Sequence, residues 1–129
     1  MRIIHLVLLF SLLLAPAFAA PIADFVNGSM TATTVKVAGT GGYSVLSVNA
    51  SNPNAVAGFI QFFDALGTAN VTLGTTTPTY VLSVPINGIL DKDLVNPFFF
   101  KSGMIVAVTT TMTGNVALTG NVALSIFYQ

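Results

Sequence analysis

Side chains that commonly carry catalysis are almost absent from this sequence. It contains no Cys and no Glu, and its one His (His5) and one Arg (Arg2) both lie at the extreme N-terminus. A Ser-His-Asp or Cys-His centre therefore cannot be built from the rest of the chain. A mechanism with paired carboxylates would have to use Asp alone. These residue types predict a protein that is not an enzyme and has no catalytic residues.

Asp91 and Asp93 form the most closely spaced pair of carboxylates, with Lys92 between them. In an extended chain, residues two apart point to the same side, and Ca²⁺ prefers carboxylate oxygens. The segment lacks the later acidic and Gly positions of an EF-hand loop, and Zn²⁺ would need His or Cys. We interpret this segment as a solvated polar turn. The glycines of residues 39–42 match no phosphate-binding motif, so we expect no metal and no cofactor.

Residues 1–19 have the pattern of a cleavable signal peptide. Met1-Arg2 supplies the positive start, Leu6 to Leu14 is apolar except for one Ser, and Ala17-Phe18-Ala19 is an A-x-A cleavage site. The alternative is an uncleaved membrane anchor, but the apolar run is shorter than the roughly 20 residues that span a bilayer. We expect cleavage after Ala19, membrane contact only during export, and a secreted protein, periplasmic or extracellular.

Residues 20–129 amount to one domain. Their seven charged residues are Asp24, Lys36, Asp64, Asp91, Lys92, Asp93 and Lys101. With no basic patch, nucleic-acid binding is not expected. A nearly neutral surface of Thr, Ser, Asn and Gly gives little colloidal protection. This composition favours self-association or a place in a larger protein assembly.

The same residues favour strands, because Val, Thr, Phe, Ile and Tyr are frequent and Gly, Pro and Asn clusters interrupt them at short intervals. We predict one all-β domain over residues 20–129, an antiparallel, jelly-roll-like β-sandwich of about eight short strands. In residues 43–49, alternation puts Val45 on one face and Val48 on the other. The expected strands are residues 35–37, 43–49, 58–64, 79–85, 98–100, 103–111 and 122–128, with a short extended piece at 71–73 and an ambiguous segment at 89–94.

Three consecutive phenylalanines, Phe98, Phe99 and Phe100, are the sharpest apolar feature. Neighbouring residues of a strand point to opposite faces, so these side chains cannot all enter one core. Either neighbouring loops cover both faces, or at least one Phe is exposed. In the second case the segment is a candidate interaction patch between subunits.

Residues 113–118 and 119–124 repeat the sequence TGNVAL. A hexapeptide β-helix needs many more copies, so we interpret the repeat as a duplication that lengthens a loop and the final strand. A slip by six residues keeps the same side chains on the same face, which predicts a weakly specified register. Separately, Asn27, Asn49 and Asn70 each begin a glycosylation sequon, which matters only in a eukaryotic source.

The middle and end of the chain resemble a group of small all-β proteins encoded in phage and prophage genomes. The resemblance runs over residues 43–129 and rests on six segments: Val48 to Ser51, Phe59 to Ala65, Gly74 to Pro78, Val81 to Pro85, Ser102 to Thr111 and Ala123 to Gln129. It implies a compact β-sandwich used as a virion or appendage component, without catalytic residues. The leader and the TGNVAL duplication depart from the group, and the leader favours a cell-surface or secreted relative.

These observations predict an exported, non-catalytic structural protein that self-associates or decorates an assembly, either a virion or an extracellular surface. The alternative is a secreted binding module, for example for carbohydrate. Because the chain has no Trp, aromatic platforms for a sugar would have to come from Tyr43, Tyr80 and Tyr128.

Overall fold

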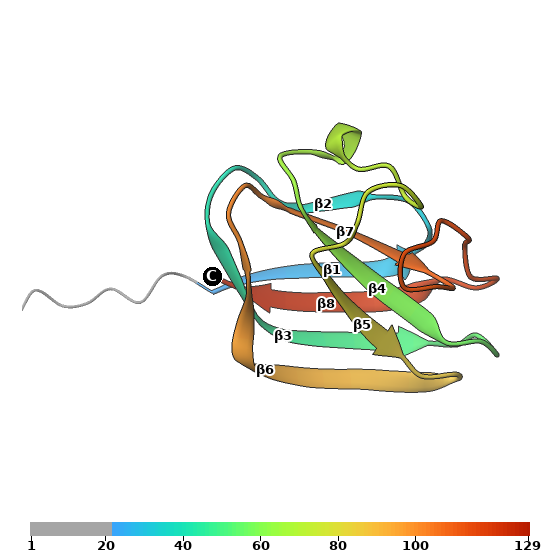
Figure 1. The fold of residues 1–129 in the computed structure, drawn as a ribbon. Helices are drawn as coiled ribbons and strands as arrows, with labels where there is room; N and C mark the ends of the chain where they lie inside the picture. The colour runs from blue at the N-terminus through green and yellow to red at the C-terminus, as the bar shows by residue number, and fades with distance from the viewer. Residues whose placement is uncertain (1–21) are drawn as a thin grey trace, which may run out of the picture.

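A computed structural model describes residues 22–129, which form two four-stranded antiparallel sheets packed face to face (Figure 1). The predicted signal peptide, residues 1–19, lies outside the described residues. The strands are β1 (Ala23–Met30), β2 (Val35–Ala38), β3 (Tyr43–Asn52), β4 (Gly58–Asp64), β5 (Tyr80–Val84), β6 (Gly88–Phe100), β7 (Met104–Thr109) and β8 (Val122–Tyr128), and a short 3₁₀ helix spans Thr68–Asn70.

The strand orders are β1-β8-β3-β6 in the first sheet and β2-β7-β4-β5 in the second. The chain crosses between the sheets after every strand except β4, which pairs directly with β5. This is the two-sheet, eight-strand arrangement of a jelly roll. The predicted β-sandwich is therefore confirmed.

The strand positions agree with the sequence in most places and differ in three. β4 and β8 have the predicted bounds, whereas β1 was not expected, and the segments at 89–94 and 98–100 belong to one long strand, β6. β1 is hard to recognise because only Met30 is buried in it, and its other side chains alternate between half-buried and exposed. The extended piece expected at residues 71–73 is not a strand.

A β-bulge corrects the predicted facing of β3. Val45 and Val48 were expected on opposite faces, but both are fully buried. The pairings of β3 with β6 and with β8 both shift register between Val45 and Ser47. Relative to β8, β3 has one extra residue at this point, and this residue resets the alternation, so both valines enter the core.

The core between the sheets is built from aliphatic side chains and one aromatic cluster. Phe62 of β4 and Phe100 of β6 are fully buried, and their ring centroids lie 6.1 Å apart. Phe98 stacks on Tyr80 of β5 with the ring planes 4° apart and the centroids separated by 4.2 Å. The ring contacts join the open edges of the two sheets, where β5 and β6 lie.

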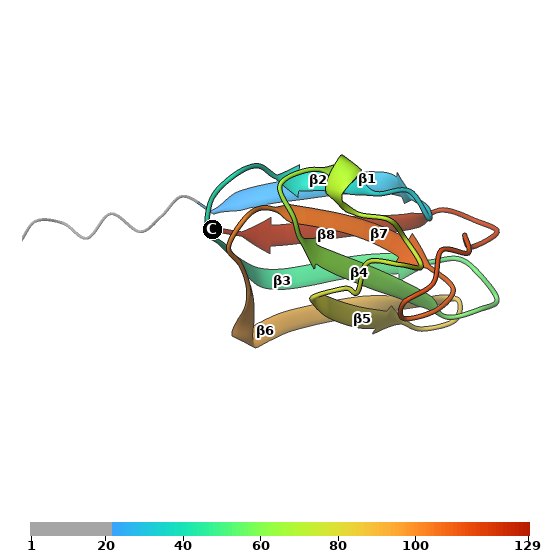
Figure 2. The same ribbon diagram turned by 45° about the horizontal axis from the view of Figure 1, so that its top comes forward.

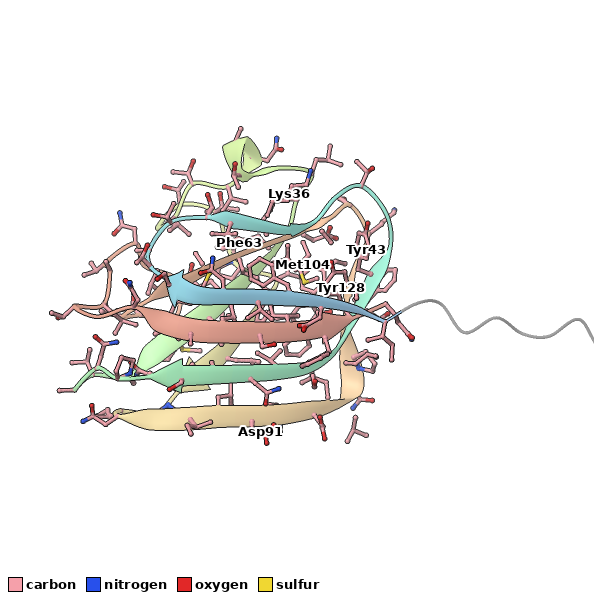
Figure 3. All side chains as sticks on the ribbon, turned by 180° about the vertical axis from the view of Figure 1, so that it is seen from behind. Lys36, Tyr43, Phe63, Asp91, Met104 and Tyr128 are labelled. Atoms are coloured by element: carbon pink, nitrogen blue, oxygen red, sulfur yellow. The ribbon has the colours of Figure 1, made fainter. Side chains whose placement is uncertain are left out.

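The outer faces of the two sheets differ. The connection from β4 to β5 folds over the second sheet and buries a small separate cluster of Phe63, Val71, Ile105 and Ala107 (Figures 1 and 2). The connection from β7 to β8 is held to the same face by Gln61. The outer face of the first sheet has no connection lying over it (Figure 3).

The TGNVAL copies occupy different environments, as the duplication reading predicted. Residues 113–118 lie in the connection between β7 and β8, whereas the second copy supplies the first three residues of β8. Val116 is exposed, while its counterpart Val122 is fully buried. The first copy lengthens the loop and the second begins the strand.

Candidate interaction surface

The three phenylalanines of β6 divide between core and surface. Phe100 is fully buried and Phe98 packs against the core, whereas 56% of Phe99 is exposed. The candidate patch therefore contracts to Phe99, because alternation along the strand turns its neighbours inward. Its ring lies over the connection between β2 and β3, where a Cβ added at Gly42 would be 3.5 Å from Phe99 Cζ.

The uncovered face of the first sheet carries a shallow apolar groove of about 250 Å³. Val26 of β1 and Ile89 of β6 stand at its two sides, and they are 70% and 73% exposed. The floor between them consists of short side chains, among them Ala123 of β8 and Ser51 of β3, which pair in register. The sequence reasoning missed both walls. The alternation of Asp24, Val26 and Gly28 with Phe25 was the available signal for β1.

Three carboxylates lie on this same face, two of them beside the groove walls. Asp24 precedes Val26 by two residues and accepts a 3.2 Å hydrogen bond from Ser125 Oγ. Asp91 follows Ile89 at the same spacing of two residues, and Asp93 lies two residues further on; Figure 3 shows Asp91 on β6 at the edge of the sheet. They share one side, as predicted, but they lie in a strand, so the interpretation as a turn was wrong. Within residues 22–129, no three acidic, His or Cys residues gather closely enough to hold a metal ion.

Charged residues concentrate on the strands at the sheet edges. Five of the seven lie on β1, β2 and β6, each an edge strand; they are Asp24, Lys36, Asp91, Lys92 and Asp93. The fourth edge strand, β5, has only five residues and is followed by Pro85. Charges, short length and proline are the devices by which proteins block edge-to-edge pairing. The sheet edges are thus poor sites for adding strands, whereas the uncovered face has no such protection at its centre.

Three turns meet at one end of the sandwich. The backbone N–H of Ala65 donates to Gly103 O at 3.2 Å. A Cβ at Gly103 would lie only 2.7 Å from both Ala65 O and Gly39 O, so only glycine allows this approach. The turn from β6 to β7 is therefore packed between the end of β4 and the connection from β2 to β3.

Asp64 fixes this meeting point. Its Oδ2 accepts a hydrogen bond from the N–H of Lys101 at 3.0 Å, and its Oδ1 accepts one from Ser102 at 2.7 Å. Partial burial by itself raises the pKa of Asp64, but hydrogen bonds from the backbone of Lys101, Ser102 and Gly103 and from the Ser102 side chain outweigh it. The net pKa lies below 3.8. Both oxygens of this carboxylate are therefore used in hydrogen bonds to the turn.

Two lysines and two exposed apolar side chains surround these turns; we call Lys36, Leu66, Phe99 and Lys101 the basic end. Lys36 reaches over the connection from β2 to β3, with Nζ 3.8 Å from a Cβ placed at Gly39. Lys101 belongs to the turn that Asp64 holds. Leu66 follows the Ala65 that pairs with Gly103, and it is 55% exposed.

Buried amides form the polar groups that the sequence reasoning did not single out. Asn52 Nδ2 donates to Val56 O and Pro85 O at 2.9 and 3.0 Å, and Asn54 Nδ2 donates to Asn52 Oδ1 and Gly120 O at 2.7 and 2.9 Å. These bonds tie three connections together at the other end of the sandwich. Their partners are main-chain groups and each other, so we assign them a structural role.

The tyrosines are used in packing. Tyr43 and Tyr128 contact edge to face with centroids 5.7 Å apart, and their hydroxyls donate to Thr40 O and Val37 O. Tyr80 stacks on Phe98. All three are half-buried. Of the sequon asparagines, Asn49 lies on the floor of the groove, Asn27 on β1 and Asn70 on the exposed 3₁₀ helix.

Comparison with protein-family models, with curated proteins and with solved structures returned no significant match. The resemblance to phage and prophage proteins therefore stays a prediction. No helix in the part of the chain from residue 22 onward is both long and apolar enough to cross a membrane.

Proposed function

We propose that this protein is an exported, non-catalytic structural protein that self-associates or decorates an assembly. The observation that carries the proposal is the difference between the two outer faces. One is covered by the chain's own connections, while the other presents Val26 and Ile89 at 70% and 73% exposure over a floor of short side chains. Exposed apolar surface rimmed by polar residues is typical of protein contact sites.

The edge charges support contact through a face. An added strand would have to pair beside Asp24, Lys36 or the Asp-Lys-Asp run of β6, which is unfavourable. The signal-peptide pattern favours an extracellular surface over a virion as the place of assembly. The carbohydrate-binding alternative has weaker support, because Tyr43, Tyr80 and Tyr128 are all engaged in packing.

The test is light scattering coupled to size-exclusion chromatography of the secreted protein, from micromolar to millimolar concentration. We expect the average mass to rise with concentration. A strict monomer throughout that range would overturn self-association and leave only decoration of a different protein.

The export part of the proposal is tested on the same sample by mass spectrometry of the intact protein. We expect an N-terminus at Ala20. A chain that retains Met1 would contradict cleavage and return the uncleaved anchor as the explanation of the leader.

A further inference from the structure

We infer that copies of this protein associate head to tail, with the basic end of one copy seated on the grooved face of the next. This inference rests on the proposed self-association and names the two surfaces that meet. The head is the groove with Asp24, Val26, Ile89 and Asp91, and the tail is the basic end.

The head offers an apolar slot with a carboxylate beside each wall. Asp24 stands two residues from Val26 on β1, and Asp91 stands two residues from Ile89 on β6. β1 and β6 are the two edges of the sheet, so the carboxylates flank the groove from opposite sides. Ala123 and Ser51 leave the middle shallow, which gives room for a side chain from outside.

The tail has the complementary composition. Leu66 and Phe99 project there as apolar side chains with exposures of 55% and 56%. Lys36 and Lys101 accompany them on two of the turns that meet around Gly103. Asp64 is the acidic side chain among them, and its two oxygens already accept hydrogen bonds from N–H groups of the turn. Exposed apolar side chains accompanied by lysines thus match an apolar groove accompanied by aspartates.

Charge excludes the simplest alternative, in which two copies stack their uncovered faces. Three of the four aspartates of residues 22–129 lie on that face, and Lys92 between Asp91 and Asp93 is directed to the opposite side by alternation. A twofold stack would bring the same acidic face together twice, and like charges in an interface are costly. A contact between two different surfaces avoids this repulsion.

The size of the face indicates a repeating assembly. Four strands about 4.8 Å apart, with about seven residues each at about 3.4 Å per residue, give a face of roughly 400 Å². Stable pairwise complexes bury about 800 Å² per partner, so one such contact is weak. A head-to-tail contact leaves a free head and a free tail on every pair, and it therefore propagates into a ring or a filament.

A charge-swap experiment tests the two surfaces. The head variant carries Asp24→Lys and Asp91→Lys, and the tail variant carries Lys36→Glu and Lys101→Glu. All four side chains are exposed, and far-UV circular dichroism and the melting temperature establish that each variant folds. Light scattering then measures the concentration of half-assembly for each variant alone and for an equimolar mixture.

Each variant alone should need a concentration at least about tenfold higher than the wild type, because both of its surfaces have the same sign. The mixture should recover assembly, since each variant's head is now opposite in charge to the other's tail. Raising the salt concentration should weaken the wild-type assembly. If the wild type assembles and the variants assemble equally well alone, or their mixture does not recover, the head-to-tail contact is wrong while self-association stands. A monomeric wild type overturns both.

Discussion

At the scale of single residues, the phenylalanines of β6 show how alternation separates two roles in adjacent positions. Phe100 has no exposed surface and contacts the rings of Phe62 and Tyr80, with centroids 6.1 and 5.6 Å away. Phe99 points to the other side and lies over Gly42. One side chain therefore contributes to folding and its neighbour to the surface.

Substitutions at these two positions should have opposite consequences. Phe100→Ala should lower the free energy of unfolding by about 3–5 kcal/mol, because a buried ring leaves a cavity. Phe99→Asp should change it by less than about 1 kcal/mol and abolish assembly. Urea denaturation and light scattering on both variants measure the two effects. Equal destabilisation would mean that Phe99 is a core residue, and the interaction patch would then be lost.

Asp64 makes stability depend on pH in a defined direction. Its pKa in the folded protein lies below the 3.8 of an unperturbed Asp, so folding favours the charged carboxylate. The stabilisation is present above about pH 4, and it is lost as the pH falls through the lowered pKa of the folded state. Asp64→Asn should therefore lower the free energy of unfolding by about 1 kcal/mol at pH 7, a small value because Asp64 is largely solvated.

Melting temperatures of wild type and Asp64→Asn between pH 7 and pH 2 provide the measurement. The two curves should converge as the pH falls below the lowered pKa of Asp64 in the folded protein, because the wild-type carboxyl is then protonated as well. Asp24→Asn is the matched control, since Asp24 accepts a single side-chain hydrogen bond at 3.2 Å. A constant gap between wild type and Asp64→Asn at all pH values would contradict the assignment.

At the scale of elements, the long connections of the second sheet are held by specific groups. Gln61 is fully buried on β4, and its Nε2 donates to Thr109 Oγ1, Thr111 O and Gly114 O at 2.8, 3.0 and 3.1 Å. These bonds anchor the connection that contains the first TGNVAL copy. One amide therefore keeps a loop of apolar and polar residues on the sheet.

Replacing Gln61 should release that loop without dissolving the sandwich. Gln61→Leu removes the side-chain donor to Gly114 O and leaves Thr111 O with Thr109 Oγ1 alone, so it should cost about 1–3 kcal/mol. Amide hydrogen exchange should speed up in residues 110–121 and stay slow in β4 and β7. Asn115→Ala, an exposed position of the same loop, serves as the control. Uniformly faster exchange throughout the domain would show that Gln61 supports the core instead.

The elements also show what the sequence can and cannot predict. Alternation in residues 58–64 and 122–128 predicts β4 and β8 with the correct bounds, because the side chains that these strands turn into the main core are apolar. β1 escapes prediction because an edge strand buries little, and the β3 bulge escapes because one inserted residue leaves no local mark. The groove walls Val26 and Ile89 lie far apart in sequence. They stand on either side of one groove only because β8 and β3 pair between β1 and β6.

The TGNVAL repeat shows that a local pattern can also predict more freedom than the fold allows. The TGNVAL copies alone allow a six-residue slip of β8, yet the slip would place Gly120 where the buried Ile126 stands. In the observed register, Asn54 Nδ2 also donates a 2.9 Å hydrogen bond to Gly120 O. The residues that follow the repeat therefore specify the register, so the expected weakness does not extend to the whole strand.

At the scale of the whole molecule, the first and last strands lie side by side. Ala23 of β1 pairs with Tyr128 of β8, so almost the whole chain must close on itself before these strands meet. Folds dominated by such non-local pairings fold slowly, typically in milliseconds to seconds. The chain loses the entropy of closing this long loop before it forms the contacts that offset the loss.

A circular permutant should fold faster for that reason. Joining Gln129 to Ile22 through a short Gly-Ser linker, with new termini after the exposed Ala55, turns β1 and β8 into a local hairpin and leaves β4 and β5 consecutive in the chain. The closure cost saved is at most about 3 kcal/mol on the logarithmic loop-length scale. Since the chain has no Trp, stopped-flow tyrosine fluorescence follows the reaction. If β1 and β8 pair in the transition state, the folding rate rises while the unfolding rate stays nearly constant. An unchanged folding rate would mean that β1 joins the sheet after the barrier, as its slight burial and its place at the edge would allow.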